Sequence, residues 1–425
     1  MNYHEFRFKN YSFDSINKTL RLEYGYDEAL HFSETYRFDF PFTQYDPVVF
    51  DAAAQQLFFL AGVSYYKMYL APDINIEQGV LDEPLATFLR NTYQRGLGEF
   101  FYINQLDPQF PIPFRADVGK LQPVAANSKG LLVGIGGGKD SLVSVELLRS
   151  SGLDIATWSL NHRAQLTPLV ERIGLPHYYV EREWDPQLKV LNEQGAYNGH
   201  VPISAIIAAV GTIVSILTGR RDHVVSNEQS ANEPTLTYKG VYINHQYSKS
   251  QAFEREYQAL LRHAFGDTLR YYSLLRPLSE LRIAELFSSY FERYHDVFSS
   301  CNTAFRHGNN RLFWDGKCAK CAFIFLIMTP FVERAKLEAL FGGRNLLLDP
   351  ALEPTYRQLL GIEAEKPLDC VGEVRESREA MRQAQSYYPQ LSNYAFTPDR
   401  AYDFRALASH EIPPEIWDRI QPNVI

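Results

Sequence analysis

The residues most able to do chemistry in this sequence lie in LLVGIGGGKDSLVSVELLRSSG, residues 131–152. An apolar run breaks into a cluster of glycines, the triplet Lys139, Asp140 and Ser141 follows, and a helical pattern begins at once. Glycines let backbone N–H groups close around a polyphosphate, and the N-terminus of the following helix adds a partial positive charge. This stretch therefore predicts a phosphate-binding loop, and a helix cap with glycines used for packing is the structural alternative.

The spacing of the glycines distinguishes between kinds of phosphate-binding loop. A kinase or GTPase P-loop requires G-x-x-x-x-G-K-[ST], but the segment from Gly134 to Gly138 is one residue too short and an aspartate follows the lysine. A dinucleotide loop requires G-x-G-x-x-G, but Lys139 takes the sixth position. What remains is a phosphate-binding loop of another kind, in which Lys139 can neutralise phosphate charge, Asp140 can hold Mg²⁺ and Ser141 can donate a hydrogen bond. Its six residues are Gly136, Gly137, Gly138, Lys139, Asp140 and Ser141.

Three further polar stretches lie next to predicted ends of strands or helices, where ligand-binding side chains gather. They are YNGHVPISA (197–205), SNEQSAN (226–232) and INHQYSKS (243–250). Their candidate site residues are Asn198, His200, Ser226, Asn227, Glu228, Asn244, His245, Gln246, Ser248, Lys249 and Ser250. A single histidine or lysine of this kind is commonly a surface residue, but three such stretches together favour a pocket. Cys370, in KPLDCVGEV, is a further acid/base candidate, with a packed cysteine as the alternative.

A repeating pattern of strand, glycine turn and helix begins at about residue 126. The expected strands are 130–136, 153–160, 176–183 and 222–228, and the expected helices are 140–151, 163–174 and 201–219. Elements that alternate in this way predict an α/β fold with a doubly wound parallel sheet. Ligands bind outside the carboxyl ends of such strands, so the glycine loop and SNEQSAN are expected at the same edge.

The composition and the residue pattern change along the sequence and indicate three regions. Residues 1–125 are rich in Tyr and Phe, with alternating runs at 19–27 and 32–40 that predict half-buried antiparallel strands. We therefore expect a separate N-terminal α+β domain that contributes to substrate binding. Residues 126–330 form a second predicted domain, which contains the phosphate-binding loop and which the resemblance described below makes an ATP-binding catalytic domain, and residues 331–425 form a helical C-terminal extension.

The composition is that of an ordinary soluble globular protein, with 425 residues of which 45% are hydrophobic and 22% charged. A net charge of −8 gives no overall attraction to nucleic acid or anionic lipid. The N-terminus lacks the apolar segment of a signal peptide, and the apolar stretch 201–219 is at the lower length limit for a membrane span. We expect a buried helix there, a cytoplasmic protein, and neither a nucleic-acid nor a membrane partner. The oligomeric state stays open.

Three cysteines gather late in the chain, at Cys301, Cys318 and Cys321, with Asp315 three residues before the Cys-x-x-Cys pair. This arrangement is similar to the C…C-x-x-C-x-x-C zinc site of the 7-cyano-7-deazaguanine synthases, with aspartate in place of the second cysteine. Three thiolates and a carboxylate can bind Zn²⁺ tetrahedrally. The alternative is a loop with free or buried thiols and no metal.

The motifs together resemble known families. GGGKDS resembles the S-G-G-x-D-S loop of the PP-loop ATP pyrophosphatases, with Gly136 where that superfamily usually has serine. The set AGVSYYKMYLAP, GIGGGKDS, NGHVPISA, VVSNEQSAN, INHQYSKS and EKPLDCVGEV, with the aromatic N-terminus, resembles the UDP-N-acetylmuramoyl-L-alanyl-L-glutamate epimerases over nearly the whole chain. The superfamily resemblance implies cleavage of ATP between its α and β phosphates and adenylation of the substrate.

The family resemblance implies ATP- and Mg²⁺-dependent epimerisation of the terminal L-Glu of UDP-MurNAc-L-Ala-L-Glu to D-Glu through an acyl adenylate, with release of AMP and pyrophosphate, in peptidoglycan precursor synthesis. Residues 136–141 would then bind ATP and Mg²⁺ together with Ser226, Asn227 and Glu228. The substrate and acid/base contacts would come from His200, His245 and Lys249. Two alternatives remain: a nucleobase enzyme, either deazaguanine synthase-like or RNA-thiolating, and a non-catalytic adenine-nucleotide sensor.

Overall fold

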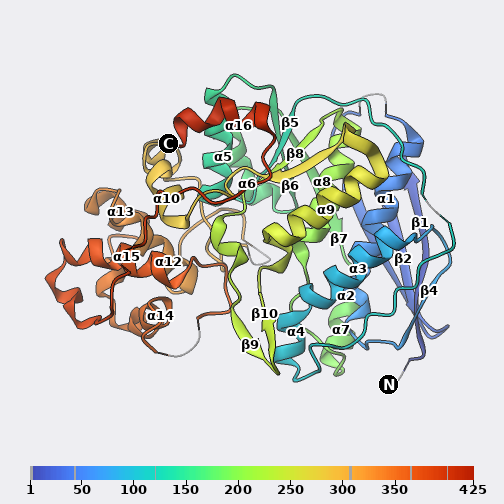
Figure 1. Ribbon diagram of the computed structural model, residues 1–425, viewed down its shortest axis with the longest axis horizontal. Coiled ribbons are helices and arrows are strands. Elements are labelled where there is room, and N and C mark those ends of the chain that lie inside the picture. Colours follow the sequence, from blue (N-terminus) through green and yellow to red (C-terminus); the bar gives the residue numbers. More distant parts are fainter. Residues whose placement is uncertain (1–2, 43–44, 120, 306–308, 364–365, 400) are drawn as a thin grey trace.

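Five strands from the second quarter of the chain onward form the parallel half of a nine-stranded sheet (Figure 1). The computed structural model describes residues 3–42, 45–119, 121–305, 309–363, 366–399 and 401–425. The strands are β5 (Leu131–Gly134), β6 (Ile155–Leu160), β7 (His177–Glu183), β8 (Asp222–Val225) and β11 (Arg270–Ser273). Their order across the sheet is β11-β8-β5-β6-β7, so connections run outward on both sides of β5. This is a doubly wound order with its switch point between β5 and β8, and the predicted α/β class is confirmed.

Helices cover both faces of this parallel half because side chains alternate along each strand. Leu131 and Val133 of β5 belong to one hydrophobic core, and Leu132 belongs to the other. The first core includes α5 (Lys139–Ser150), α6 (Arg163–Ile173) and α10 (Glu280–Ser288). The second includes α8 (Ile203–Thr218) and α9 (Gln251–Phe265). The apolar stretch 201–219 is therefore a buried core helix, as predicted.

The N-terminal strands continue the same sheet. They are β1 (Glu5–Asp14), β2 (Thr19–Tyr26), β3 (Leu30–Phe38) and β4 (Asp73–Ile76). β3 pairs antiparallel with β7, from Thr35 opposite Glu183 to Phe38 opposite Val180. Helix α1 (Pro47–Ala61) packs against α8, and their apolar residues share one core. We expected residues 1–125 to form a separate domain, but among the described residues the sheet and the hydrophobic core both continue across residue 125. The pairing of β3 with β7 also covers what would otherwise be an exposed edge strand.

One helical stretch among the described residues is long and apolar enough to cross a membrane. It is Pro47–Tyr66, which comprises α1 and α2 (Val63–Tyr66), with a mean hydropathy of 1.3. Of its most apolar window, 83% is buried inside the protein. This stretch packs as a core helix beneath β1–β3, beside α3 (Glu83–Gly96) and α4 (Gly98–Ile103).

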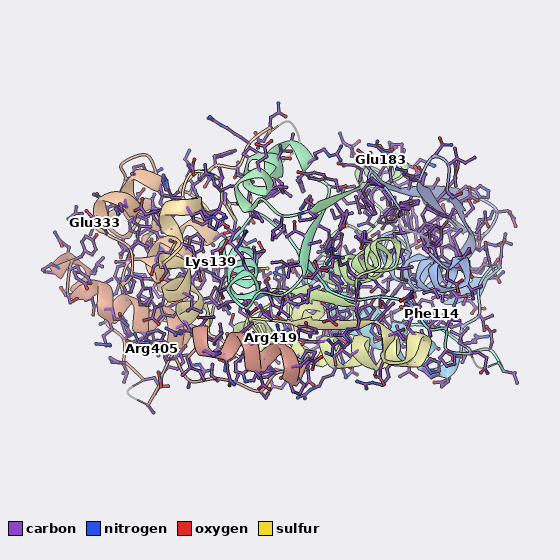
Figure 2. The ribbon with its side chains drawn as sticks, turned by 90° about the horizontal axis from the view of Figure 1, so that it is seen from above. Phe114, Lys139, Glu183, Glu333, Arg405 and Arg419 are labelled. Atoms are coloured by element: carbon purple, nitrogen blue, oxygen red, sulfur yellow. The ribbon has the colours of Figure 1, made fainter. Side chains whose placement is uncertain are left out.

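The C-terminal region is helical, as predicted, and packs on the α5 face of the sheet. The helices within residues 331–425 are α13 (Arg334–Leu340), α14 (Glu353–Leu359), α15 (Val374–Gln385) and α16 (Pro414–Ile420), and α12 (Ala319–Met328) precedes them. The smaller remaining elements are α7 (Gln187–Glu193), β9 (Leu236–Tyr238), β10 (Val241–Ile243) and α11 (Phe291–Tyr294). Figure 2 places Lys139 between the C-terminal helices, marked by Glu333 and Arg405, and the N-terminal region, marked by Phe114. The glycine loop is thus central in the molecule.

Candidate active site

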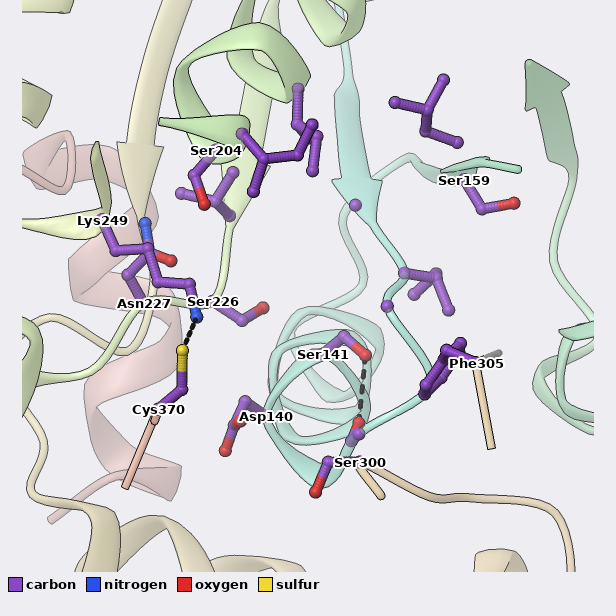
Figure 3. A pocket seen from close by; sticks show the side chains of 18 of the residues that line it. Asp140, Ser141, Ser159, Ser204, Ser226, Asn227, Lys249, Ser300, Phe305 and Cys370 are labelled. Atoms are coloured by element: carbon purple, nitrogen blue, oxygen red, sulfur yellow. Dashed lines mark hydrogen bonds between the residues drawn. The ribbon is translucent and has the colours of Figure 1, made fainter. Parts of the chain in front are cut away.

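A cavity of about 610 Å³ lies at the carboxyl edge of the parallel strands, next to the switch point. Its walls come from the segments that follow β5, β6, β7 and β8, and Figure 3 shows part of this lining. The predicted site residues that line it are Gly136, Gly138, Lys139, Asp140, Ser141, Ser226, Asn227, Glu228 and Lys249. The candidate Cys370 lines it as well. The candidates of the loop and of the three polar stretches that lie outside the lining are Gly137, Asn198, His200, Asn244, His245, Gln246, Ser248 and Ser250. The volume is in the range of sites for small molecules and nucleotides.

The glycine loop is open toward a ligand. A Cβ atom built on Gly136 would meet no atom within 4 Å, so this position leaves room against the backbone. Gly137 has φ +92°, which favours glycine, and its carbonyl accepts a 3.0 Å hydrogen bond from the N–H of Ser299. Helix α5 begins directly after Gly138, so its N-terminus faces the cavity. This geometry fits a polyphosphate.

Lys139 is buried and fully engaged with acidic partners. Its Nζ lies 2.5 Å from Oδ1 of Asp140 and also contacts the carboxylate of Glu280. Burial opposes the charged form, but Asp140 and Glu280 raise the pKa of Lys139 above its ordinary value. Burial in turn raises the pKa of Glu280 well above its ordinary value, against the opposing effect of Lys139. Lys139 therefore orients Asp140, and one ammonium shared by two carboxylates leaves little free positive charge for phosphate.

The carboxylates at this edge supply oxygen ligands for a divalent cation. The side chain of Asp140 is 31% exposed, and Glu228, though buried, also lines the cavity. Mg²⁺ prefers carboxylate oxygens together with substrate phosphates. Ser141 donates to the carbonyl of Gly138 over 3.1 Å, so its hydroxyl stabilises the loop in this arrangement (Figure 3). The set fits a nucleotide bound as its magnesium complex.

Cys370 and Lys249 meet in the cavity wall. Nζ of Lys249 lies 3.3 Å from Sγ of Cys370, and Figure 3 shows the pair across from Asp140. Burial opposes the thiolate, but Lys249 and His245 lower the pKa of Cys370 to about 7. Burial likewise opposes the ammonium of Lys249, and Cys370 and Glu228 raise its pKa above the ordinary value. An ammonium–thiolate pair is thus stable near neutral pH.

Two histidines and a glutamate lie behind Cys370. The charge of Cys370 acts on His245, and Nδ1 of His245 contacts the carboxylate of Glu99 in α4. Burial opposes protonation of His245, but Cys370 and Glu99 raise its pKa to about 9. Nδ1 of His200 lies 3.7 Å from the same carboxylate, and burial and then His245 lower the pKa of His200 to about 4. The structure therefore brings both predicted histidines together, directly behind the residues that line the cavity.

One residue of this cluster had no signal in the sequence, and some predicted site residues are structural. Glu99 lies in an aromatic helix, and only the fold places it beside His245. Asn244 accepts from the N–H of Gln246 over 2.7 Å and shapes the turn, while Ser250 caps the N-terminus of α9. These residues position Lys249 rather than face a ligand.

The three late cysteines and the aspartate also meet. Sγ of Cys318 lies 3.4 Å from Sγ of Cys321 and 3.9 Å from Sγ of Cys301. Oδ1 of Asp315 lies 3.3 Å from Sγ of Cys321, and the four ligand atoms all lie within 4.8 Å of one another. All four cysteines of the chain are free thiols. The four residues 301, 315, 318 and 321 could hold a metal ion.

Comparison with known proteins gives the family. The model of the MurL N-terminal domain matches residues 1–274, and that of the MurL C-terminal domain matches residues 297–396. The chain is 36% identical over 443 aligned residues to the UDP-N-acetyl-alpha-D-muramoyl-L-alanyl-L-glutamate epimerase of Xanthomonas oryzae pv. oryzae, covering 98% of this chain and 97% of that one.

Two proteins of the same name are each 37% identical over 88% of this chain. They come from a Micromonospora species and from Salinispora tropica, with 86% and 84% of their lengths covered. No solved structure matches the chain. The chain therefore belongs to the MurL family of UDP-N-acetyl-alpha-D-muramoyl-L-alanyl-L-glutamate epimerases.

Proposed function

We propose that this protein is an ATP- and Mg²⁺-dependent epimerase that converts the terminal L-Glu of UDP-MurNAc-L-Ala-L-Glu to D-Glu. Membership of the family supports the substrate and the inversion. The observation that carries ATP dependence is the open glycine loop at the N-terminus of α5, beside Asp140 and at the switch point of the sheet. We place the reaction in the cytoplasm, in peptidoglycan precursor synthesis.

The chemistry explains why ATP is needed. The hydrogen on Cα of a glutamate is very weakly acidic, because its removal would put negative charge next to a carboxylate. An oxygen of the α-carboxylate attacks the α-phosphorus of ATP, and pyrophosphate leaves. The acyl adenylate has lost the carboxylate charge, and its carbonyl can accept the electron pair when the Cα proton is removed. Return of a proton on the opposite face, then hydrolysis, gives D-Glu and AMP.

The residues of the loop have distinct roles in this proposal. The backbone around Gly136 and Gly138 binds the phosphates, and Lys139 orients Asp140 toward the cation. Mg²⁺, when bound by Asp140 with Glu228 nearby, neutralises charge on the leaving pyrophosphate. This contribution is needed because Lys139 already shares its charge between two carboxylates.

The test is incubation of the full chain with ATP, Mg²⁺ and UDP-MurNAc-L-Ala-L-Glu, followed by measurement of AMP and of the configuration of glutamate. We expect AMP and D-Glu together. Asp140→Asn should lower AMP formation by about 100-fold or more. Asp154→Asn, which removes an exposed carboxylate paired with Arg220, is the matched control and should stay within about threefold of the wild type.

The same assay separates the alternatives. AMP formation only with a purine or RNA substrate would favour a deazaguanine synthase-like or RNA-thiolating enzyme, which shares the predicted loop chemistry. Binding of ATP without any AMP formation would favour a nucleotide sensor. Formation of D-Glu without ATP would contradict the adenylation proposal.

A further inference from the structure

We propose that Cys370 is the catalytic residue that takes the proton from Cα of glutamate, and that Glu99 positions it through His245. This inference rests on the proposed epimerisation and assigns one of its two proton transfers. The proposed site combines residues that are far apart in the sequence. Lys249 and Cys370 are 121 positions apart, and Glu99 and His245 are 146 positions apart.

Access to the cavity separates Cys370 from the other acid/base candidates. Cys370 and Lys249 line the cavity, whereas His245 and His200 lie behind the wall. Lys249 points its ammonium at Sγ of Cys370 over 3.3 Å, so its charge stabilises the thiolate rather than serving as a free base. Among these groups, the sulfur is the basic atom that a substrate in the cavity can reach.

The cations that face Cys370 come from three elements, and the carboxylate of Asp369 accepts the backbone N–H of Cys370 over 2.8 Å and lies 3.7 Å from Nζ of Lys320. Lys249 ends the turn before α9, His245 lies in the preceding loop, and Lys320 lies in the first turn of α12. All three lower the pKa of Cys370, while burial raises it. Glu99 holds the ring of His245 from the opposite side. The thiolate is therefore held between cations, and Glu99 acts on it only through His245.

The proton transfer balances without a further cofactor. The thiolate forms an S–H bond as the Cα–H bond breaks, and the electron pair moves onto the carbonyl oxygen of the adenylate. Water on the opposite face supplies the proton that completes the inversion, and the thiol returns its proton to solvent. In D₂O the product must therefore carry deuterium at Cα.

The decisive variant is Cys370→Ser in the full chain, assayed in D₂O with ATP and UDP-MurNAc-L-Ala-L-Glu. We expect AMP formation within about threefold of the wild type, and a loss of about 100-fold or more in both D-Glu and deuterium at Cα. Unchanged deuterium incorporation would overturn the assignment. Loss of AMP formation as well would place Cys370 in substrate binding and would also overturn it. Absence of AMP with the wild type would instead contradict the proposed function itself.

Glu99→Gln tests the positioning role, because the amide keeps the shape but loses the charge. We expect the acidic limb of the pH–rate profile for epimerisation to shift to higher pH by about one unit, while the rate of AMP formation stays unchanged. Glu256→Gln, in a carboxylate that pairs with Arg95 outside this cluster, is the matched control. An acid limb that does not shift in Glu99→Gln would overturn the positioning role. The role would also be overturned if the wild type bound a metal ion that Glu99→Gln did not, because Glu99, His200 and His245 would then form a metal site.

A separate observation carries a second proposal: we infer that Cys301, Asp315, Cys318 and Cys321 bind one Zn²⁺. A tetrahedral site with Zn–S bonds of about 2.3 Å places its sulfurs about 3.8 Å apart. The observed Sγ–Sγ distances of 3.4 and 3.9 Å and the S–O distance of 3.3 Å are close to this geometry. Thr303 donates to Oδ2 of Asp315 over 2.7 Å, which leaves Oδ1 facing the sulfurs.

This site lies where it can fix the wall of the nucleotide cavity. Ser299, two residues before Cys301, donates its N–H to the carbonyl of Gly137. Ser300 and Asn302 flank Cys301 and line the cavity, as does Lys320 between the other two cysteines. A metal that joins these segments therefore holds them against the glycine loop, and its role is structural.

Zinc content of the purified chain, measured without ATP or substrate, tests this inference. We expect about one zinc per chain, less than about a tenth of that in Cys318→Ser, and full content in Cys370→Ser as the matched cysteine control. Asp315→Cys keeps four ligands and should retain the metal even where Cys318→Ser fails to fold. A wild-type chain that holds no zinc after incubation with ZnCl₂, or Cys318→Ser with full content, would overturn the site.

Discussion

Replacement of Lys249 by methionine should raise the pKa of the Cys370 thiol and so make it less reactive at neutral pH. Nζ of Lys249 lies 3.3 Å from Sγ, and its charge is the main influence that lowers the pKa of Cys370 to about 7 against the effect of burial. Methionine fills similar space without charge. The pKa should then return toward its ordinary value of 9.0.

The size of the effect follows from these two values. A thiol with a pKa of about 7 is about half thiolate at pH 7, whereas one with a pKa near 9 is about 1% thiolate. Only the thiolate reacts rapidly with iodoacetamide. Alkylation of Cys370 at pH 7 should therefore slow by about 50-fold, and the midpoint of the rate profile should move up by about two pH units.

The assay follows the peptide that contains Cys370 by mass spectrometry between about pH 6 and about pH 10, so that the other cysteines do not interfere. Lys366→Met is the matched control, because Lys366 pairs with Glu233, whereas the cations that lower the pKa of Cys370 are Lys249, His245 and Lys320. Its midpoint should stay near 7. A midpoint in Lys249→Met that moves by less than about half a unit would refute the electrostatic account of this site.

Three further predictions concern the scaffold and the loop. Gly211→Ala should destabilise the fold by about 2 kcal/mol or more in urea unfolding, because a Cβ there would lie 2.0 Å from the ring of His223. Glu34→Ala should cost about 3–5 kcal/mol because it leaves the buried Arg182 unpaired, and Glu34→Leu with Arg182→Met should recover most of that loss. Gly136→Val should keep the unfolding free energy within about 1 kcal/mol, since its Cβ meets open space, yet weaken ATP binding by about tenfold or more in calorimetry.

Local sequence patterns predicted the parallel sheet but not its extent. Apolar runs separated by glycine turns identified β5 to β8, because each strand and its following helix are encoded within a short segment. The alternating runs of β2 and β3 were also predicted as strands. Their joining to β7 was not, because alternation specifies a strand and a buried face but not the partner across a gap of more than a hundred residues.

In the candidate site, too, contiguous motifs could be predicted from the sequence, whereas pairings between distant residues could not. Residues 136–141 could be predicted as a candidate site because a phosphate-loop motif is contiguous and its spacing can be read from the sequence. The buried pairing of Lys139 with Glu280 could not, since it joins residues 141 apart. Nothing in GEFFYI, the sequence of α4, marks Glu99 as a site residue, and only its contact with His245 in the fold makes it a candidate.

The arrangement couples the two halves of the proposed reaction through Lys249. Its ammonium is influenced by the thiolate of Cys370 and also by the carboxylates of Glu228 and Asp140, the residues proposed to face the cation. A cation and phosphates bound at those carboxylates would offset their negative field. Lys249 would then be left with Cys370 as its principal counter-charge, which favours the thiolate. Binding of the nucleotide would thus increase the fraction of Cys370 present as thiolate at the stage when the adenylate can form, and in an ATP titration the alkylation midpoint of Cys370 should fall below 7.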